Sequence, residues 1–116
     1  MPCVAQADLV QTVGNTSGAE TDKFATYGLQ TFNGEHTEAP LLEGCVAWLE
    51  CRLLPEPHNQ QTYDLFLGEV VAAYADERVF SEGHWHFEGQ DQLRTLHHIA
   101  GGNFLTIGQP ITGRQL

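Results

Sequence analysis

The stretch CVAWLECRLL, from Cys45 to Leu54, decides the fold class of this chain. It is rich in branched and aromatic residues and alternates partly, with Glu50 and Arg52 on one side, as a half-buried β-strand does. The polar connection PEPHNQQ (residues 55–61) follows it, and TYDLFLGEVVAAYAD (residues 62–76) resumes the apolar pattern. Two such stretches joined by a polar loop predict a β-hairpin, with Gly68 as the expected bulge in the second strand.

Downstream of this hairpin the chain predicts further short strands separated by turn residues. The turns are SEG, EGQDQ and AGGN, in which glycine and small polar residues favour chain reversal. Several short strands with turns marked by glycine indicate an antiparallel β-barrel rather than a parallel sheet. The expected strands are Val79–Phe80, Trp85–Phe87, Arg94–Ile99 and Phe104–Ile107.

The part upstream of the hairpin predicts two short helices. The first covers Gln6–Val13 and ends at Gly14. The second is expected over Gly18–Tyr27, because Ser17 and Glu20 have the spacing of a capping box and Gly28 follows where a helix often ends. The 116 residues therefore predict a single domain, mainly β with short helices.

The composition excludes several classes of partner. With a formal net charge of −10 and only five Lys and Arg residues, the chain is not suited to nucleic acid or to an anionic membrane surface. No segment approaches the roughly 20 apolar residues that span a bilayer, and the N-terminus has no secretory pattern. Cys45 and Cys51 are expected on one strand face about 20 Å apart, too far for a disulfide, so with Cys3 they predict reduced thiols and a cytoplasmic location.

Lys23, the only lysine, lies in the stretch TSGAETDK (residues 16–23). A phosphate dianion in so acidic a chain needs a cation or backbone N–H donors. The hydroxyls of Thr16 and Ser17, the backbone of Gly18 and the ammonium of Lys23 together offer such a site. The alternative is a capped helix with a lysine that faces solvent.

The histidines in GHWHFE raise a competing hypothesis. His84 and His86 share one face of an extended segment, with Glu88 beyond, which is how some barrels begin a metal site. His97 or His98 is available as a further ligand, although the spacing is incomplete and ordinary surface histidines remain the alternative.

Other side chains in the apolar strands have structural expectations. Glu50 and Glu69 each need a partner if buried, and Arg52 or Arg94 is the expected one. The alternative is that both carboxylates point outward. The aromatic residues are expected mostly in the core or at an interface between subunits; they are Trp48, Phe66, Tyr74, Trp85 and Phe104.

Four stretches, in this order, resemble the flavin reductase-like family of FMN-binding split β-barrel proteins. They are SGAETDKFATYGL, APLLEGCVAWLECRL, YDLFLGEVVAA and LHHIAGGNFLTIG, and together they cover nearly the whole chain. The resemblance implies an antiparallel split β-barrel. It also implies that the chain corresponds to the C-terminal part of the fold, because family members carry an N-terminal portion before the segment matching MPCVAQADLVQTVG.

The resemblance implies a function as well. Hydride would pass from NADH or NADPH to bound FMN, with FAD as the alternative flavin, and reduced flavin would be delivered to a partner oxygenase. Because the cofactor carries the chemistry, no catalytic nucleophile or acid–base pair is expected. Thr16, Ser17, Gly18 and Lys23 would hold the phosphate, Trp85 a ring edge, and His97 or His98 the ring end.

A homodimer, or a separately encoded N-terminal piece, would complete the pocket. Two other readings stay open. One is a non-catalytic remnant or interaction module that keeps the barrel core. The other is the metal-binding barrel of His84, His86 and Glu88.

Overall fold

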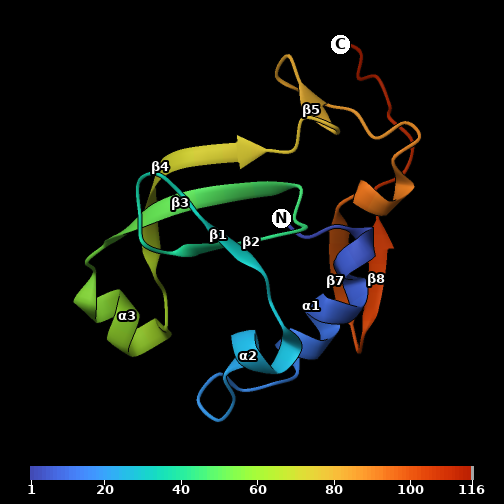
Figure 1. The fold of residues 1–116 in the computed structure, drawn as a ribbon. Helices are drawn as coiled ribbons and strands as arrows, with labels where there is room; N and C mark the ends of the chain where they lie inside the picture. Colours follow the sequence, from blue (N-terminus) through green and yellow to red (C-terminus); the bar gives the residue numbers. More distant parts are fainter. Residues whose placement is uncertain (116) are drawn as a thin grey trace.

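The structure, a computed structural model, describes residues 1–115 as short helices and paired antiparallel strands (Figure 1). This confirms the expected mainly β architecture with short helices. No helix among these residues has the length and apolar character needed to cross a membrane. In chain order the elements are η1 (Val4–Gln6), α1 (Ala7–Gly14), α2 (Lys23–Tyr27), β1 (Thr31–Asn33), β2 (Pro40–Leu42), β3 (Ala47–Leu54), α3 (Pro57–Tyr63), β4 (Leu67–Ala75), β5 (Phe80–Ser81), β6 (His84–Trp85), η2 (Asp91–Leu93), β7 (Leu96–Ala100) and β8 (Asn103–Thr106).

The central hairpin pairs β3 with β4, as predicted, but its bulge is not at Gly68. The pairing shifts register between Glu50 and Cys51, which face Ala72 and Val70, so Val71 is the extra residue. Gly68 pairs regularly with Leu53. A Cβ atom at Gly68 would lie 3.1 Å from the Cβ of Cys51, so glycine is used there for close approach.

The connection between β3 and β4 is a helix, so the prediction of a polar loop over residues 55–61 is wrong. Pro57 occupies the first turn of α3, where its missing N–H costs nothing. The helix ends at Asp64, which has the left-handed φ of 54°. The second strand consequently begins at Leu67 instead of Thr62. The short strands β1 and β2 were also not predicted, because three residues carry too little alternation to show a period.

Of the two predicted helices, the first is confirmed and the second starts later than expected. The α2 helix begins at Lys23 because the Asp22 carboxylate accepts a hydrogen bond from Ala25 N at 3.1 Å and caps it. Ser17 Oγ instead accepts from Ala19 N at 3.2 Å within a turn, so the expected capping box does not form. Gly28 ends α2 with a φ of 60°, as its place in the sequence predicts.

Two further hairpins, β5–β6 and β7–β8, confirm the expected short strands with boundaries shifted by a few residues. Each turn uses two residues with positive φ, namely Glu82–Gly83 and Gly101–Gly102. Such turns match the right-handed twist of the flanking strands. Among residues 1–115 the strands form four separate two-stranded ladders.

A small core joins the N-terminus to the strands. Cys3, Val46 and Val79 are fully buried together with Phe87. The backbone links the same parts, because Val46 N donates to the carbonyl of Met1 and Cys3 forms a bridge with Thr95. Phe66 and Trp85, in contrast, are exposed and not in the core. The expectation of a core position is therefore wrong for these two residues, and an interface between subunits stays a prediction for them.

The cysteines are free thiols, but their placement differs from the prediction. Cys45 is buried and precedes β3, whereas Cys51 is exposed within β3. The strand starts at Ala47, so strand alternation does not relate the two side chains.

Candidate functional site

The loop between α1 and α2 brings together the residues expected to bind an anion. Lys23 Nζ donates a hydrogen bond of 2.9 Å to the carbonyl of Val13, at the end of α1. The ammonium group is therefore partly buried and does not point into open water. A Cβ atom at Gly18 would lie 3.8 Å from Lys23 Cε, so Gly18 directly neighbours the lysine side chain. The cation offsets the negative end of the α1 dipole.

The hydroxyls of the same loop already have partners. Thr16 Oγ1 donates to the carbonyl of Thr12 at 3.0 Å. The Tyr27 hydroxyl lies 2.6 Å from Thr16 Oγ1. Tyr27 belongs to α2, so this contact ties α2 to the end of α1. Ser17 is more exposed, and its hydroxyl accepts a local hydrogen bond from Ala19 N.

One of the two adjacent histidines lies close to this loop. His98 lines a cavity of about 260 Å³ together with Asn15 and Phe104, and Asn15 directly precedes Thr16. Its ring centroid is 5.2 Å from that of Phe104. His97 points to the opposite face of β7, because neighbouring strand residues alternate. Figure 1 shows α1 beside β7 and β8, which is what forms this cavity.

Trp85 is not brought together with these residues. Its ring lies 5.0 Å from that of Phe80 and stacks on Phe87 at 5.6 Å with an interplanar angle of 5°. Phe80 and Trp85 pair in the hairpin β5–β6, and Figure 1 shows β5 at the opposite end of the molecule from α2. Trp85 and Phe80 line a separate cavity of about 560 Å³ together with Met1 and the start of β3.

The histidines of the competing metal hypothesis make other contacts. His84 Nδ1 lies 2.8 Å from the carbonyl of Glu82, and His86 Nε2 lies 2.9 Å from Ser81 Oγ. Across residues 1–115 no group of three or more His, Cys, Asp or Glu side chains is arranged to hold a metal ion. The observed geometry thus gives the site of His84, His86 and Glu88 no support.

Glu50 is the best-defined polar site, and its partners differ from those expected. The side chain is 1% exposed. It accepts hydrogen bonds from the backbone N–H groups of Glu35, His36 and Thr37 at 3.1, 3.0 and 2.8 Å, and from the Tyr74 hydroxyl at 2.6 Å. The Thr37 hydroxyl donates a further bond. A carboxylate with this many donors is fully satisfied without a cation.

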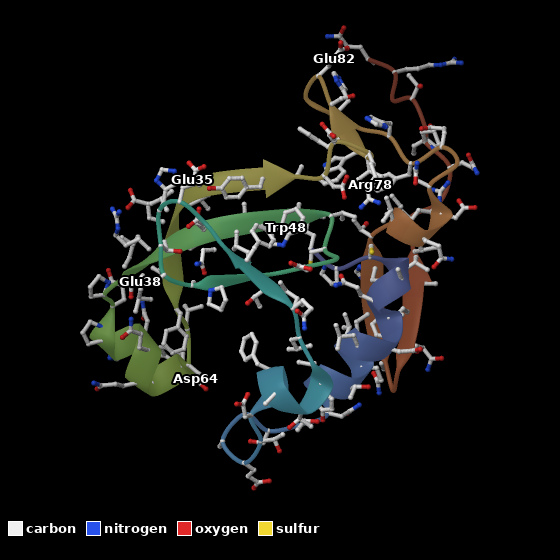
Figure 2. All side chains as sticks on the ribbon, in the orientation of Figure 1. Glu35, Glu38, Trp48, Asp64, Arg78 and Glu82 are labelled. Carbon is white, nitrogen blue, oxygen red and sulfur yellow. The ribbon has the colours of Figure 1, made fainter. Side chains whose placement is uncertain are left out.

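This site fixes the loop between β1 and β2 onto the central hairpin. Figure 2 shows Glu35 and Glu38 on that loop where it passes β3 and β4. Gly34 directly precedes the loop residues whose N–H groups donate to Glu50. A Cβ atom at Gly34 would collide with the Glu50 carboxyl group, so only glycine fits there. On the same side of the hairpin, Trp48 Nε1 donates to the carbonyl of Leu42 at 2.7 Å. The loop and β2 together cover this side.

The hydrogen bonds determine the charge state of the site. The Tyr74 hydroxyl, followed by the three backbone N–H groups, lowers the pKa of Glu50 from 4.5 to about 2, against the opposing effect of burial. The same contact raises the pKa of Tyr74. Glu50 is therefore a carboxylate at neutral pH, held by neutral donors.

The other expected charge pairs are surface contacts. Arg52 lies 3.9 Å from Glu69, but both side chains are exposed, so Glu69 follows the alternative of a carboxylate that points outward. Arg94 pairs with Asp91 at 2.9 Å and does not approach Glu50. The sequence did contain a signal for the Glu50 site. Glu50 lies in an apolar strand, and Tyr74 lies two residues from Ala72, which pairs with Glu50 on the facing strand.

The sequence matches a family model described as flavin reductase like domain over residues 3–96. Because this match starts at residue 3, it gives no support to the expectation of a missing N-terminal portion. The protein YddH of Escherichia coli, described as uncharacterized, is 47% identical over 113 residues, which are 97% of this chain and 59% of the relative. The chain thus spans about three fifths of the length of this relative.

Solved structures resemble the fold closely. An FMN-binding domain of a flavin reductases-like enzyme from Shewanella baltica is 44% identical, with a TM-score of 0.90 over 97% of this chain and 60% of the other. A flavoredoxin of Desulfovibrio vulgaris is 21% identical, with a TM-score of 0.75 over 97% of this chain and 59% of the other, and so supports the fold alone. The fold class is the split barrel of these proteins, as expected.

Proposed function

Because this chain belongs to the flavin reductase-like domain family, we propose that it binds FMN and takes part in flavin reduction by NADH or NADPH. The observation that carries the proposal is the close similarity, in sequence and in backbone, to an FMN-binding domain from Shewanella baltica. Since the chain spans only about three fifths of that protein, flavin binding is the primary proposal, and reduction of the flavin follows from it.

We assign the phosphate end of the flavin to the loop between α1 and α2. An ammonium group has three N–H donors, and the bond to Val13 uses one of them. The other two remain for phosphate oxygens, with Ser17 and the backbone of Gly18 beside them. In a chain of net charge −10, this partly buried cation is the feature that offsets the charge of a dianion. Thr16 supports the loop through Thr12 and Tyr27.

The ring end of the flavin would contact His97 or His98 and Trp85, and a single molecule of this chain does not bring all of these side chains next to Lys23. His98 lies on the side of the loop and would border the flavin of its own chain, with His97 as the less well placed alternative. Trp85 belongs to the hairpin β5–β6, and Figure 1 shows β5 far from α2, so we propose that Trp85 reaches the ring only from a second copy in a homodimer. This arrangement gives the expected dimer a chemical role.

The bound flavin supplies the redox chemistry, accepting a hydride from a nicotinamide. The protein side chains contribute binding and exclusion of water, and none needs to act as an acid or a base. FAD in place of FMN, delivery of reduced flavin to an oxygenase and a cytoplasmic location are parts of the same proposal. The three free thiols support the last of these.

Replacing Lys23 by alanine is expected to weaken FMN binding by about 10- to 150-fold, which corresponds to about 1.5–3 kcal/mol for a hydrogen bond to a charged group. Titration of the protein with FMN, followed by the change in its visible absorption band, measures the effect. Arg52→Ala, which removes one exposed positive charge elsewhere, is the matched control and should leave the affinity unchanged.

An equal affinity of the Lys23→Ala variant and the natural protein would remove the lysine from the site. Since Lys23 also binds the end of α1, the melting temperature Tm of each variant is measured alongside. If the natural protein itself takes up no FMN, the non-catalytic interaction module becomes the better description.

A further inference from the structure

The dipeptide Asn33–Gly34 lies where β1 ends and the loop to β2 begins. Asn33 is exposed. It is the one asparagine of the chain that a glycine follows, since Asn15, Asn59 and Asn103 precede threonine, glutamine and phenylalanine. Because glycine has no Cβ atom, the peptide nitrogen that follows Asn33 is not shielded by a side chain.

The Glu50 site explains why position 34 is glycine. A Cβ atom there would collide with the Glu50 carboxyl group, which is fixed by backbone N–H groups of the same loop. Every other residue type carries a Cβ atom, so the buried carboxylate excludes all of them. The contact that orders the loop therefore also keeps the sequence Asn–Gly in the chain.

An asparagine followed by glycine can lose its side-chain amide without an enzyme. The Gly34 nitrogen attacks Cγ of Asn33, so that a new C–N bond closes a succinimide ring. The bond from Cγ to Nδ2 breaks, and the departing nitrogen takes up a proton and leaves as ammonia. Water then opens the ring at one of its carbonyl carbons and gives aspartate or isoaspartate. An amide and water thus become a carboxylate and ammonium, with no change of oxidation state.

The folded backbone opposes this reaction. Asn33 belongs to a strand, and ring closure needs the Gly34 nitrogen to rotate towards the Asn33 side chain, out of the extended geometry. Strand pairing holds this end of β1 weakly, because the residue opposite Asn33 is Pro40, which has no N–H to donate. The loop is held instead by the N–H groups that donate to Glu50. Their free energy therefore determines how frequently the chain opens here.

We propose that Asn33 is a site of spontaneous deamidation and that the hydrogen bonds of Glu50 set its rate. The product carries a carboxylate directly before the loop, on which Glu35 and Glu38 already lie (Figure 2), and like charges repel. Isoaspartate also lengthens the main chain before the N–H groups that hold Glu50. Both changes weaken the loop, so the modification removes the contact that delayed it. This inference concerns the lifetime of the folded chain and goes beyond flavin binding.

The test incubates the protein at mildly alkaline pH and follows each asparagine by peptide mass spectrometry. Asn33 is expected to convert before the other asparagines. Glu50→Gln is expected to raise the rate at Asn33 by about 10- to 100-fold, which corresponds to about 1.4–2.7 kcal/mol in the free energy of loop opening. Glu69→Gln is the matched control, because Glu69 is an exposed carboxylate on β4, and it should leave the rate unchanged.

Asn103, at the start of β8, distinguishes local opening from general unfolding in the same sample. Tyr74→Phe removes one donor to Glu50 and keeps the carboxylate, so it should raise the rate at Asn33 by less than Glu50→Gln does. The proposal is overturned if Asn33 is not the first asparagine to convert, or if Glu50→Gln leaves its rate unchanged. It is also overturned if Glu50→Gln speeds Asn33 and Asn103 by the same factor. None of these measurements involves flavin, so each outcome leaves the proposed function standing.

Discussion

A Gly34→Ala variant is expected to lose about 3 kcal/mol or more of its free energy of unfolding, and its Tm is expected to fall by more than about 10 °C. The added methyl group would occupy the position of the Glu50 carboxyl group, which has no room to retreat at 1% exposure. Either the loop at residues 34–37 moves away or the carboxylate leaves its donors. Both outcomes leave buried polar groups without partners, which is costly.

Thermal unfolding followed by circular dichroism measures this effect. Gly14→Ala is the control, because Gly14 ends α1 and a Cβ atom there meets nothing within 4 Å. Alanine in a helix is favoured over glycine, so this control should keep or slightly raise the Tm. Equal Tm values for Gly34→Ala and the natural protein would show that Glu50 does not hold the loop.

Glu50→Gln is expected to lower the Tm at pH 7 by on the order of 10 °C, and the difference should shrink as the pH falls. Glutamine presents an NH₂ group to N–H donors that now bind a carboxylate oxygen. The folded pKa of Glu50 is about 2, below its ordinary value of 4.5, so between these pH values the unfolded state binds more protons. Stability from Glu50 is therefore complete above about pH 4.5 and is lost as the pH falls towards 2.

Urea unfolding at pH 7, 5, 4 and 3 tests the sign of this dependence. Asp76, whose pKa is lowered by Arg78, also contributes to acid sensitivity, but it does so in the variant and in the natural protein alike. The difference between the two proteins therefore isolates Glu50. Glu69→Gln, which alters an exposed carboxylate, should show no such trend. A difference that stays constant from pH 7 to pH 3 would contradict an ionised, hydrogen-bonded Glu50.

Tyr74→Phe provides an independent check on the cause of the shift. The Tyr74 hydroxyl makes the largest contribution to the lowered pKa of Glu50. Its removal is expected to move the acid-induced loss of stability to higher pH, while the three backbone donors remain. The same urea series measures this, and an unchanged pH dependence would assign the shift to the backbone alone.

Local pattern was enough to predict the central hairpin, the two later hairpins and the α1 helix. Strand alternation and turn glycines act over a few residues, so they predict local structure without knowledge of the tertiary contacts. The same reasoning placed the α2 helix too early, since Ser17 and Asp22 both suit a helix cap and only the contact with Ala25 distinguishes them. It also read residues 55–61 as a loop, although proline at the first turn is compatible with a helix.

The candidate site was predicted only in part, for a similar reason. The sequence places Thr16, Ser17 and Gly18 in one loop and Lys23 shortly after it, at the start of α2, and in the fold Gly18 neighbours the lysine side chain. The bond from Lys23 to the carbonyl of Val13 depends on how the chain returns from the loop to the end of α1. The place of His98 beside this loop depends on how α1 packs against β7 and β8, and Trp85 lies elsewhere, in the hairpin β5–β6. No local pattern contains that packing.

By itself, the sequence determined the mainly β class, the acidic surface and the family, because these depend on composition, short-range periodicity and the order of motifs. The tertiary structure alone decided that Glu50 is buried among neutral donors and that one face of the hairpin is uncovered. The first fact joins Glu50 to Glu35–Thr37 and Tyr74, which are far from it in the chain, and the second depends on which other segments pack against β3 and β4. A side chain becomes buried only when other segments of the folded chain pack against it, so burial does not follow from the residue and its sequence neighbours alone.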